Sequence, residues 1–216
     1  MIITAIDRAP KRRGRMQVHL DGVSKFELSV ATARKYELKR GGELSAAQAE
    51  GIVAADARHA ALTAAAAMLA RRPHSEREVR VRLRRRGCEP DVVDETIRKL
   101  TSARLLDDAE YAQAWTESRD RISPRGRRLI EQELRANGVA IAIAQEAAEQ
   151  ISDSEAAMRA ASRRLSAMRG LDCETFRKRL GPFLQRRGFD WETCSGTVER
   201  CWQELHNEVP ADDRDA

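Results

Sequence analysis

The chain contains few aromatic residues. Phe, Trp and Tyr make up 4% of its 216 residues, whereas charged residues make up 34%. The cores must therefore be built mainly from Ala, Leu, Val and Ile, and we expect them to be small beneath an extensive solvated surface. The tryptophans fall at repeat-aligned or helical positions, which favours core packing over ligand stacking for Trp115, Trp191 and Trp202.

The sequence also lacks the features of a membrane or secreted protein. No run approaches the roughly 18 consecutive apolar residues of a membrane span, and no apolar stretch follows the positive charges near the N-terminus. The cysteines have no Cys-x-x-Cys spacing, which favours core thiols in a reducing compartment over a metal site. They are Cys88, Cys173, Cys194 and Cys201. We expect a soluble, cytoplasmic monomer that does not bind membranes.

No catalytic constellation is present. The sequence has no glycine-rich phosphate loop, no nucleophile elbow and no His-Glu-x-x-His motif. Asp107 and Asp108 are adjacent carboxylates that could be imagined in metal chemistry, but they precede a helix with Tyr111 and Trp115 on its apolar side. Helix capping explains the pair better. We predict that the protein is not an enzyme and needs neither cofactor nor metal.

What the chain does have is a tandem repeat marked by three glycines. Gly87, Gly138 and Gly188 each close an arginine-rich amphipathic segment and recur at separations of 51 and 50 residues. A leucine stands four positions before each glycine and another apolar residue stands eight positions before it, which places both on one helix face. A second amphipathic helix follows each glycine, and a third precedes the arginine-rich segment. The preceding helices align at Ala60, Tyr111 and Ala161, and one turn later at Ala64, Trp115 and Leu165.

Each repeat is therefore predicted to contain three helices. The predicted fold is mainly α, with tandem three-helix repeats that form an elongated curved array. The predicted domains are an N-terminal element with β-strands and short helices, three repeats, and an acidic disordered tail. Their ranges are 1–54, 55–105, 106–153, 154–206 and 207–216.

The first 30 residues differ from the repeats. Short alternation of apolar and polar residues predicts a β-hairpin or a three-stranded meander, with a turn at Asp21-Gly22. The segment from Arg8 to Arg15 holds five basic residues, counting both ends, and it is either a solvated hairpin loop or a loop that contacts phosphate.

Capping signals predict where several helices begin. Helices are expected over residues 32–38 and 57–71, and Ser45–Gln48 is a capping box that begins another. A second box, Ser75–Glu78, begins the first arginine-rich helix. The equivalent helix of the second repeat is expected to begin near residues 124–126, and Ser152–Glu155 is expected to cap the start of the third repeat.

Ordered motifs in the first two repeats resemble the RecX family, whose members regulate the RecA recombinase. The motifs are Ser75-x-x-Glu78-Val79-x-x-x-Leu83-x-x-x-Gly87, then Leu105-Leu106-Asp107-Asp108-x-x-Tyr111-Ala112, then Ile130-Glu131-Gln132-Glu133-Leu134-x-x-x-Gly138-Val139. The resemblance covers residues 55–205 and is strongest from Leu69 to Gly138. It implies a row of three-helix repeats and a regulator that binds the RecA–DNA filament. One departure is Gly126-Arg127, where family members often carry Gly-Pro, and Pro124 lies two residues upstream.

The net charge of +5 and the pI near 9.3 favour a polyanion or an acidic protein as partner. Eight arginines crowd residues 71–86 against only two glutamates, and the spacing of Arg77, Arg80 and Arg84 places them on one helix face. These side chains form either a solvated face or a surface that binds the filament or DNA phosphate. The candidate binding residues are Arg71, Arg72, Arg77, Arg80, Arg84, Arg85, Arg121, Arg125, Arg127, Arg128 and Arg135.

Two functions remain open at this point. The resemblance implies a regulator that binds the RecA filament and mainly inhibits its ATPase and strand exchange, in DNA repair and the SOS response. The arginine excess alone is also typical of a DNA-binding protein that acts independently of RecA and binds DNA tightly by itself, whereas the RecA regulator is expected to bind single- or double-stranded DNA only weakly when RecA is absent.

Overall fold

The computed structural model describes residues 1–10 and 14–207. Residues 11–13 of the predicted basic loop and residues 208–216 of the predicted acidic tail lie outside this range. The chain divides into two compact units, of which the first contains Met1–Arg72 and Val79–Leu106. The second contains Pro73–Glu78 and the chain from Asp107 onward. Each unit is described by itself below.

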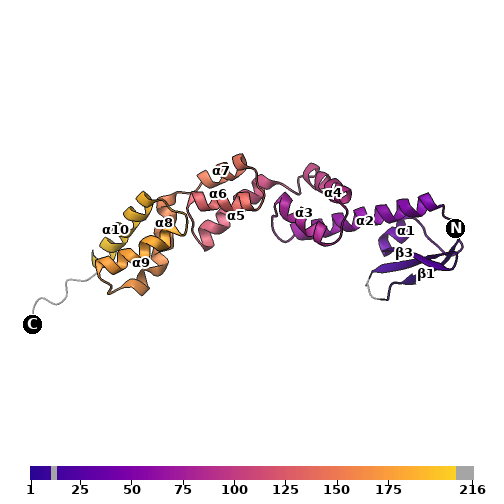
Figure 1. Ribbon diagram of the computed structural model, residues 1–216, viewed down its shortest axis with the longest axis horizontal. Coiled ribbons are helices and arrows are strands. Elements are labelled where there is room, and N and C mark those ends of the chain that lie inside the picture. The colour runs from indigo at the N-terminus through magenta and orange to yellow at the C-terminus, as the bar shows by residue number, and fades with distance from the viewer. Residues whose placement is uncertain (11–13, 208–216) are drawn as a thin grey trace, which may run out of the picture. The chain divides into compact units, whose positions relative to one another are not determined.

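The first unit begins with a three-stranded antiparallel meander of strands β1 (Ile3–Arg8), β2 (Arg15–Leu20) and β3 (Val23–Ser29), with β2 in the middle (Figure 1). Val18 of β2 pairs with Ile6 on one side and Phe26 on the other. Asp21 and Gly22 join β2 to β3 with φ angles of 50° and 80°. Two consecutive left-handed residues match the right-handed twist of a hairpin. The predicted meander and its turn are confirmed.

One long helix joins this sheet to the first repeat. Helix α1 (Val30–Lys35) follows β3, and α2 (Ala46–Leu69) begins at the predicted capping box, in which Ser45 and Gln48 each accept a hydrogen bond from the other's backbone N–H. The helix expected over residues 57–71 is the C-terminal part of α2. Its alanine-rich sequence contains no proline that would interrupt it, so the helix runs through the predicted boundary between residues 54 and 55.

The repeats contain the expected helices. The first unit adds α3 (Glu76–Arg85), whose first turn belongs to the second unit, and α4 (Pro90–Ser102). The second unit contains α5 (Asp108–Ile122), α6 (Arg127–Ala136) and α7 (Ile141–Glu149), followed by α8 (Asp153–Leu165), the short 3-10 helix η1 (Ser166–Met168), α9 (Cys173–Gln185) and α10 (Trp191–Asn207). Figure 1 shows the groups α5–α7 and α8–α10 succeeding one another along this unit.

The apolar positions of the arginine-rich helices are confirmed as core. Val79 and Leu83 of α3 and Ile130 and Leu134 of α6 are fully buried. The first-helix alignment is wrong by one residue in the first repeat, because Ala60 is exposed, whereas its neighbour is buried. The buried alanines of α2 are Ala61 and Ala65. Alanines therefore line this side of the core, as the scarcity of aromatics indicated.

The third repeat departs from the period in its first helix. Buried residues occupy the fourth and fifth positions of both α5 and α8, at Tyr111 and Ala112 and at Ala156 and Ala157. These pairs lie 45 residues apart, whereas Gly138 and Gly188 lie 50 apart. The helix η1 and a longer α9 take up the difference.

One of the three tryptophans does not pack in the core. As expected, the Trp115 ring packs against Tyr111 in a tilted arrangement, and Trp202 packs edge-on against Phe176. Trp191 is 75% exposed, because it is the first residue of α10 and precedes the buried stripe that begins at Cys194.

The cysteines of α10 behave as core residues. Cys194 and Cys201 are buried thiols, and burial raises the pKa of Cys201 to about 11. A thiol with so high a pKa is protonated and unreactive at neutral pH.

Among the described residues, α2 alone is long and apolar enough to cross a membrane by length and composition. A single such helix is weak evidence, because core helices of soluble proteins pass the same test. In this chain α2 packs against β3 and α4.

Candidate interaction surface on the arginine-rich helices

Helix α3 displays its arginines because two apolar residues and a capping box fix its orientation. Ser75 Oγ accepts from the Glu78 N–H at 3.2 Å, and the Glu78 carboxylate accepts from the Ser75 N–H at 3.3 Å. Val79 and Leu83 face the core. The helix stops at Gly87, whose φ of 80° allows the Cys88 N–H to donate to the Leu83 carbonyl at 3.2 Å. The positions between the apolar residues therefore point outward.

Outward positions near the end of α3 carry four arginines. Arg82, Arg84, Arg85 and Arg86 are exposed, and none of them forms an ion pair or a side-chain hydrogen bond with any described residue. Arg71, at the end of α2, is exposed in the same way. Arg72 beside it is exposed as well. Arg82 and Arg86 are absent from the candidates chosen from the sequence, because composition cannot tell a paired arginine from an unpaired one.

The predicted face of Arg77, Arg80 and Arg84 is divided by the structure. Arg80 forms an ion pair with Asp94 of α4 and is only partly exposed. Arg77 donates from Nη1 to the Ala136 carbonyl at 3.0 Å. Arg84 forms no ion pair with a described residue, although the hydrogen bond from Arg80 and the positive charges of Arg80 and Arg84 lower the pKa of Asp94.

In the second repeat, Glu133 of α6 gathers three donors. Its carboxylate accepts from Trp115 Nε1 and from Arg119 Nε, each at 3.0 Å, and it forms an ion pair with Arg125. The Arg119 guanidinium lies over the Trp115 ring, 4.3 Å from its centre. Burial, together with the positive charges of Arg119 and Arg187, lowers the pKa of Arg125. Arg125, a predicted binding residue, is held within the fold.

The other candidates of the second repeat are all exposed, but some are paired with carboxylates and others are not. Arg127 donates to Asp153 from both its backbone nitrogen and its side chain, and Arg135 pairs with Glu131 one turn earlier. Arg121 and Arg128 are exposed, and their side chains form no ion pair with a described residue.

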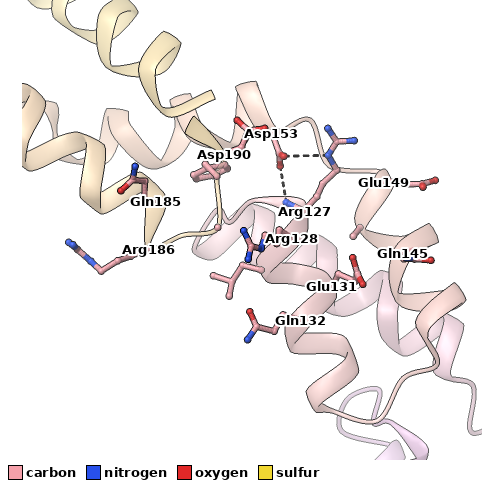
Figure 2. Close-up of a pocket in the computed structure, with 14 residues that line it drawn as sticks. Arg127, Arg128, Glu131, Gln132, Gln145, Glu149, Asp153, Gln185, Arg186 and Asp190 are labelled. Atoms are coloured by element: carbon pink, nitrogen blue, oxygen red, sulfur yellow. Dashed lines mark hydrogen bonds and ion pairs between the residues drawn. The ribbon is translucent and has the colours of Figure 1, made fainter. Parts of the chain in front are cut away.

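A cleft of about 840 Å³ lies beside Arg128, lined by α6, α7 and the turn before α10. Figure 2 shows Arg127 turned toward Asp153, while Arg186 extends away from α6. The charged residues that line the cleft are Arg127, Arg128, Arg186, Glu131, Glu149, Asp153 and Asp190. Because four carboxylates outnumber three arginines there, the cleft does not have the uniform positive charge that a polyanion requires.

Asp107, before α5, confirms the capping prediction, and Asp108, the first residue of α5, adds to it. Asp107 caps α5 by accepting from the Ala109 N–H at 2.8 Å. Asp108 instead accepts from the Glu76 N–H at the start of α3, also at 2.8 Å. Asp153, the first residue of α8, accepts in the same way from the Arg127 N–H at the start of α6 at 2.8 Å. Each cap is therefore supplied by the following repeat.

Ser152, predicted to cap α8, makes no such hydrogen bond with its side chain. Asp108 is also partly buried, and burial together with the negative charges of Glu76 and Asp107 raises its pKa, although the hydrogen bond from Glu76 opposes this. Within residues 1–10 and 14–207, no three His, Cys, Asp or Glu side chains gather as a metal site requires.

Comparison with known proteins agrees with the arrangement of these helices. Residues 61–100 match the family description "RecX, first three-helix domain", and residues 107–147 match "RecX, second three-helix domain". The regulatory protein RecX of Prosthecochloris aestuarii is 34% identical over 139 residues, which are 64% of this chain and 91% of that protein. The chain belongs to the RecX family.

Other RecX proteins give the same result. The regulatory protein RecX of Chlorobium limicola is 32% identical over 63% of this chain and 86% of its own length. That of Listeria monocytogenes is 31% identical over 71% of this chain and 57% of its own length.

Two crystal structures share the fold. One, titled as regulatory protein RecX, superposes with a TM-score of 0.64 at 22% identity and covers 92% of this chain and 98% of its own. RecX from Lactobacillus salivarius superposes with a TM-score of 0.59 at 22% identity, over 71% of this chain and 99% of its own. Tandem three-helix repeats are thus the fold of this RecX-family chain.

Proposed function

We propose that this chain binds the filament that the RecA recombinase forms on DNA, and that it restrains the filament's ATPase and strand exchange in DNA repair and the SOS response. It acts by binding in the cytoplasm, not by catalysis. Membership of a family of regulatory proteins supports the general role. The observation that carries the proposal is a set of exposed arginines at the end of α3 that form no ion pair with a described residue, Arg82, Arg84, Arg85 and Arg86.

The chemistry of these arginines suits a nucleoprotein surface. A guanidinium binds carboxylates and phosphates equally well through its planar fork of donors. A DNA filament coated with protein presents both kinds of anion in a repeating array. Further exposed arginines on α6 and α9, Arg128 and Arg186, allow several weak contacts to act together.

The test is the ATPase of RecA on single-stranded DNA with this protein added. We expect the wild-type chain to lower the rate, and the triple variant Arg82→Ala, Arg85→Ala and Arg86→Ala to need at least about a hundredfold more protein for the same inhibition, since three charge-assisted contacts would be lost. No change in rate at saturating wild-type protein would overturn the proposal.

A matched control removes the same charge elsewhere. Arg159, Arg177 and Lys178 of the third repeat each pair with an acidic side chain. Their replacement by alanine also removes three positive charges, and we expect it to leave inhibition within about threefold of wild type. Equal losses from both triples would mean that net charge, and not the α3 surface, governs binding.

The unpaired arginines also support a second candidate, a DNA-binding protein that acts without RecA. This candidate predicts tight binding to naked DNA, with an affinity that falls steeply as salt rises. Weak binding to naked DNA, together with strong binding to the filament at the same salt concentration, would exclude it.

A further inference from the structure

The three glycines that mark the repeats have the same backbone conformation but different surroundings. Gly87, Gly138 and Gly188 have φ angles of 80°, 89° and 86°. A Cβ atom on Gly138 would lie 2.5 Å from Cβ of Arg77, and one on Gly188 would lie 2.4 Å from Cβ of Leu129. A Cβ on Gly87 would meet nothing within 4 Å. The turns at Gly138 and Gly188 are thus packed against other elements, whereas the turn at Gly87 is open.

At Gly138 and Gly188, the residue that packs against the glycine belongs to the first turn of a helix. Arg77 and Leu129 are the second and third residues of α3 and α6. The carbonyl just before each glycine accepts a hydrogen bond from the residue that caps this helix. Ser75 Oγ donates to the Asn137 carbonyl at 2.7 Å, and the Gly126 N–H donates to the Arg187 carbonyl at 2.8 Å. Both arrangements lie within the second unit.

The open turn offers the same carbonyl without a donor. Arg86 precedes Gly87 as Asn137 precedes Gly138, and its carbonyl accepts no hydrogen bond from a described residue. The negative end of the α3 dipole lies at this turn, which favours the positive end of another helix, as in the two packed turns. The Gly87 turn therefore has the shape and polarity of the two packed turns, but among the described residues no helix N-terminus packs against it.

The charges around the turn indicate which helix would fit. Arg82, Arg85 and Arg86 are exposed beside it, against the exposed Glu89 and Asp91 at the start of α4. This excess favours a helix with acidic residues in its first turn, where such residues are common. A second copy of the chain could offer the N-terminus of its third arginine-rich helix, α9. That N-terminus is already capped by Asp172, which accepts hydrogen bonds from both the N–H and the hydroxyl of Thr175. A second copy of the chain is therefore a poor occupant.

We propose that the Gly87 turn docks the N-terminus of an α-helix from the partner protein, with Ser, Thr or Gly at its cap and an acidic first turn. This rests on the function proposed above, so the partner is a RecA protomer in the filament. The cap residue donates to the Arg86 carbonyl, and the missing Cβ of Gly87 lets the helix approach as closely as α3 approaches Gly138.

The variant Gly87→Asn tests this contact, because asparagine tolerates a positive φ and its Cβ would meet nothing within 4 Å in the free protein. Binding of the labelled full-length chain to RecA filaments on single-stranded DNA would be measured by fluorescence anisotropy. We expect Gly87→Asn to bind at least about tenfold more weakly, because the side chain blocks the approach and removes a hydrogen bond, while its thermal midpoint stays within about 4 °C of wild type.

The matched control is Gly170→Asn, at another glycine with a φ of 83° and nothing near its Cβ. We expect it to bind as the wild type does. Binding of Gly87→Asn equal to that of Gly170→Asn would overturn the docking proposal and leave the proposed function standing. Failure of the wild-type chain to bind the filament would overturn both.

Discussion

Helices α3 and α6 are equivalent helices of two repeats, and both are rich in arginine, but their charges are arranged in different ways. In α3, the arginines at the C-terminal end form no ion pair with a described residue. The arginines of the second repeat are instead bound by Glu133 and Glu131 of α6 and by Asp153 of α8, although the sequence alone does not distinguish them from the arginines of α3. Equal composition thus hides a functional difference, because an arginine already bound to a carboxylate has less to offer a partner.

The glycines that end the two helices differ as well. Gly138 needs both a positive φ and the absence of a Cβ, whereas Gly87 needs only the positive φ. We therefore expect Gly138→Ala to lower the free energy of unfolding by about 3 kcal/mol, from strain and overlap with Arg77. Gly87→Ala should cost about 1 kcal/mol. Urea denaturation of both variants measures the difference, and equal losses would show that the Gly138 turn is not packed.

The acidic residues of α6 provide the next test. Glu133→Ala leaves Arg119 and Arg125 without their carboxylate partner in a partly buried site, and we expect it to lower the free energy of unfolding by about 2–3 kcal/mol. Glu131→Ala breaks only the exposed pair with Arg135 and should cost about 0.3 kcal/mol. Urea denaturation compares the two. If the two variants were equally stable, the cluster around Glu133 would not hold the repeat together.

The two units should also respond in opposite ways to acid. Burial alone would raise the pKa of Asp56, but hydrogen bonds from Thr32 and Ser29 and the charge of Arg15 outweigh it and lower the pKa. The stability that Asp56 provides is therefore present above its unfolded pKa of about 4 and is lost as pH falls through its lower folded value. Asp108 has a raised pKa, so its contribution is present below about pH 4 and is lost as pH rises through the folded value.

We expect Asp56→Asn to cost about 1–2 kcal/mol at pH 7 through loss of hydrogen bonds to a charged group. This cost should shrink as the pH falls below the unfolded pKa of about 4. Asp108→Asn should become relatively more destabilising over the same range. The free energy of unfolding of each variant, measured at pH 7 and below about pH 4, would reveal the opposite trends, and parallel trends would contradict the two pKa shifts.

The smallest expected effect concerns single surface arginines. Arg135→Ala and Arg82→Ala should each change the free energy of unfolding by less than about 0.5 kcal/mol, since one breaks an exposed pair and the other breaks none. Their effects on filament binding should differ, because only Arg82 belongs to the α3 surface. Equal effects on binding would mean that pairing does not withdraw an arginine from the partner.

Much of the fold follows from local patterns in the sequence. The glycine spacing, the leucines four residues earlier and the capping boxes at Ser45 and Ser75 predict the helices, because these signals act over a few residues. The errors arise where an insertion changes the spacing, as before α9, and where small residues hide a helix face, as at Ala60 and Ala61. Trp191 was misplaced because the pattern does not show where the buried stripe begins.

The candidate site was less predictable, because pairing depends on residues distant in sequence. Arg80 meets Asp94, and Arg127 meets Asp153 across 26 positions. Neither contact can be recognised from the sequence around either residue. The arginines of α3 were visible as a group, but only the three-dimensional arrangement separates the unpaired members from those that stabilise the fold.

The aspartates Asp108 and Asp153 cap helices that precede them in the chain, and this imposes an order on the assembly of the repeats. Each aspartate caps a helix that precedes it by 32 and 26 positions respectively. During synthesis on the ribosome, α3 and α6 therefore emerge before the residues that complete their first turns. The caps of α3 and α6 are therefore complete only after Asp108 and Asp153 have left the exit tunnel, whereas α9 carries its own cap, Asp172.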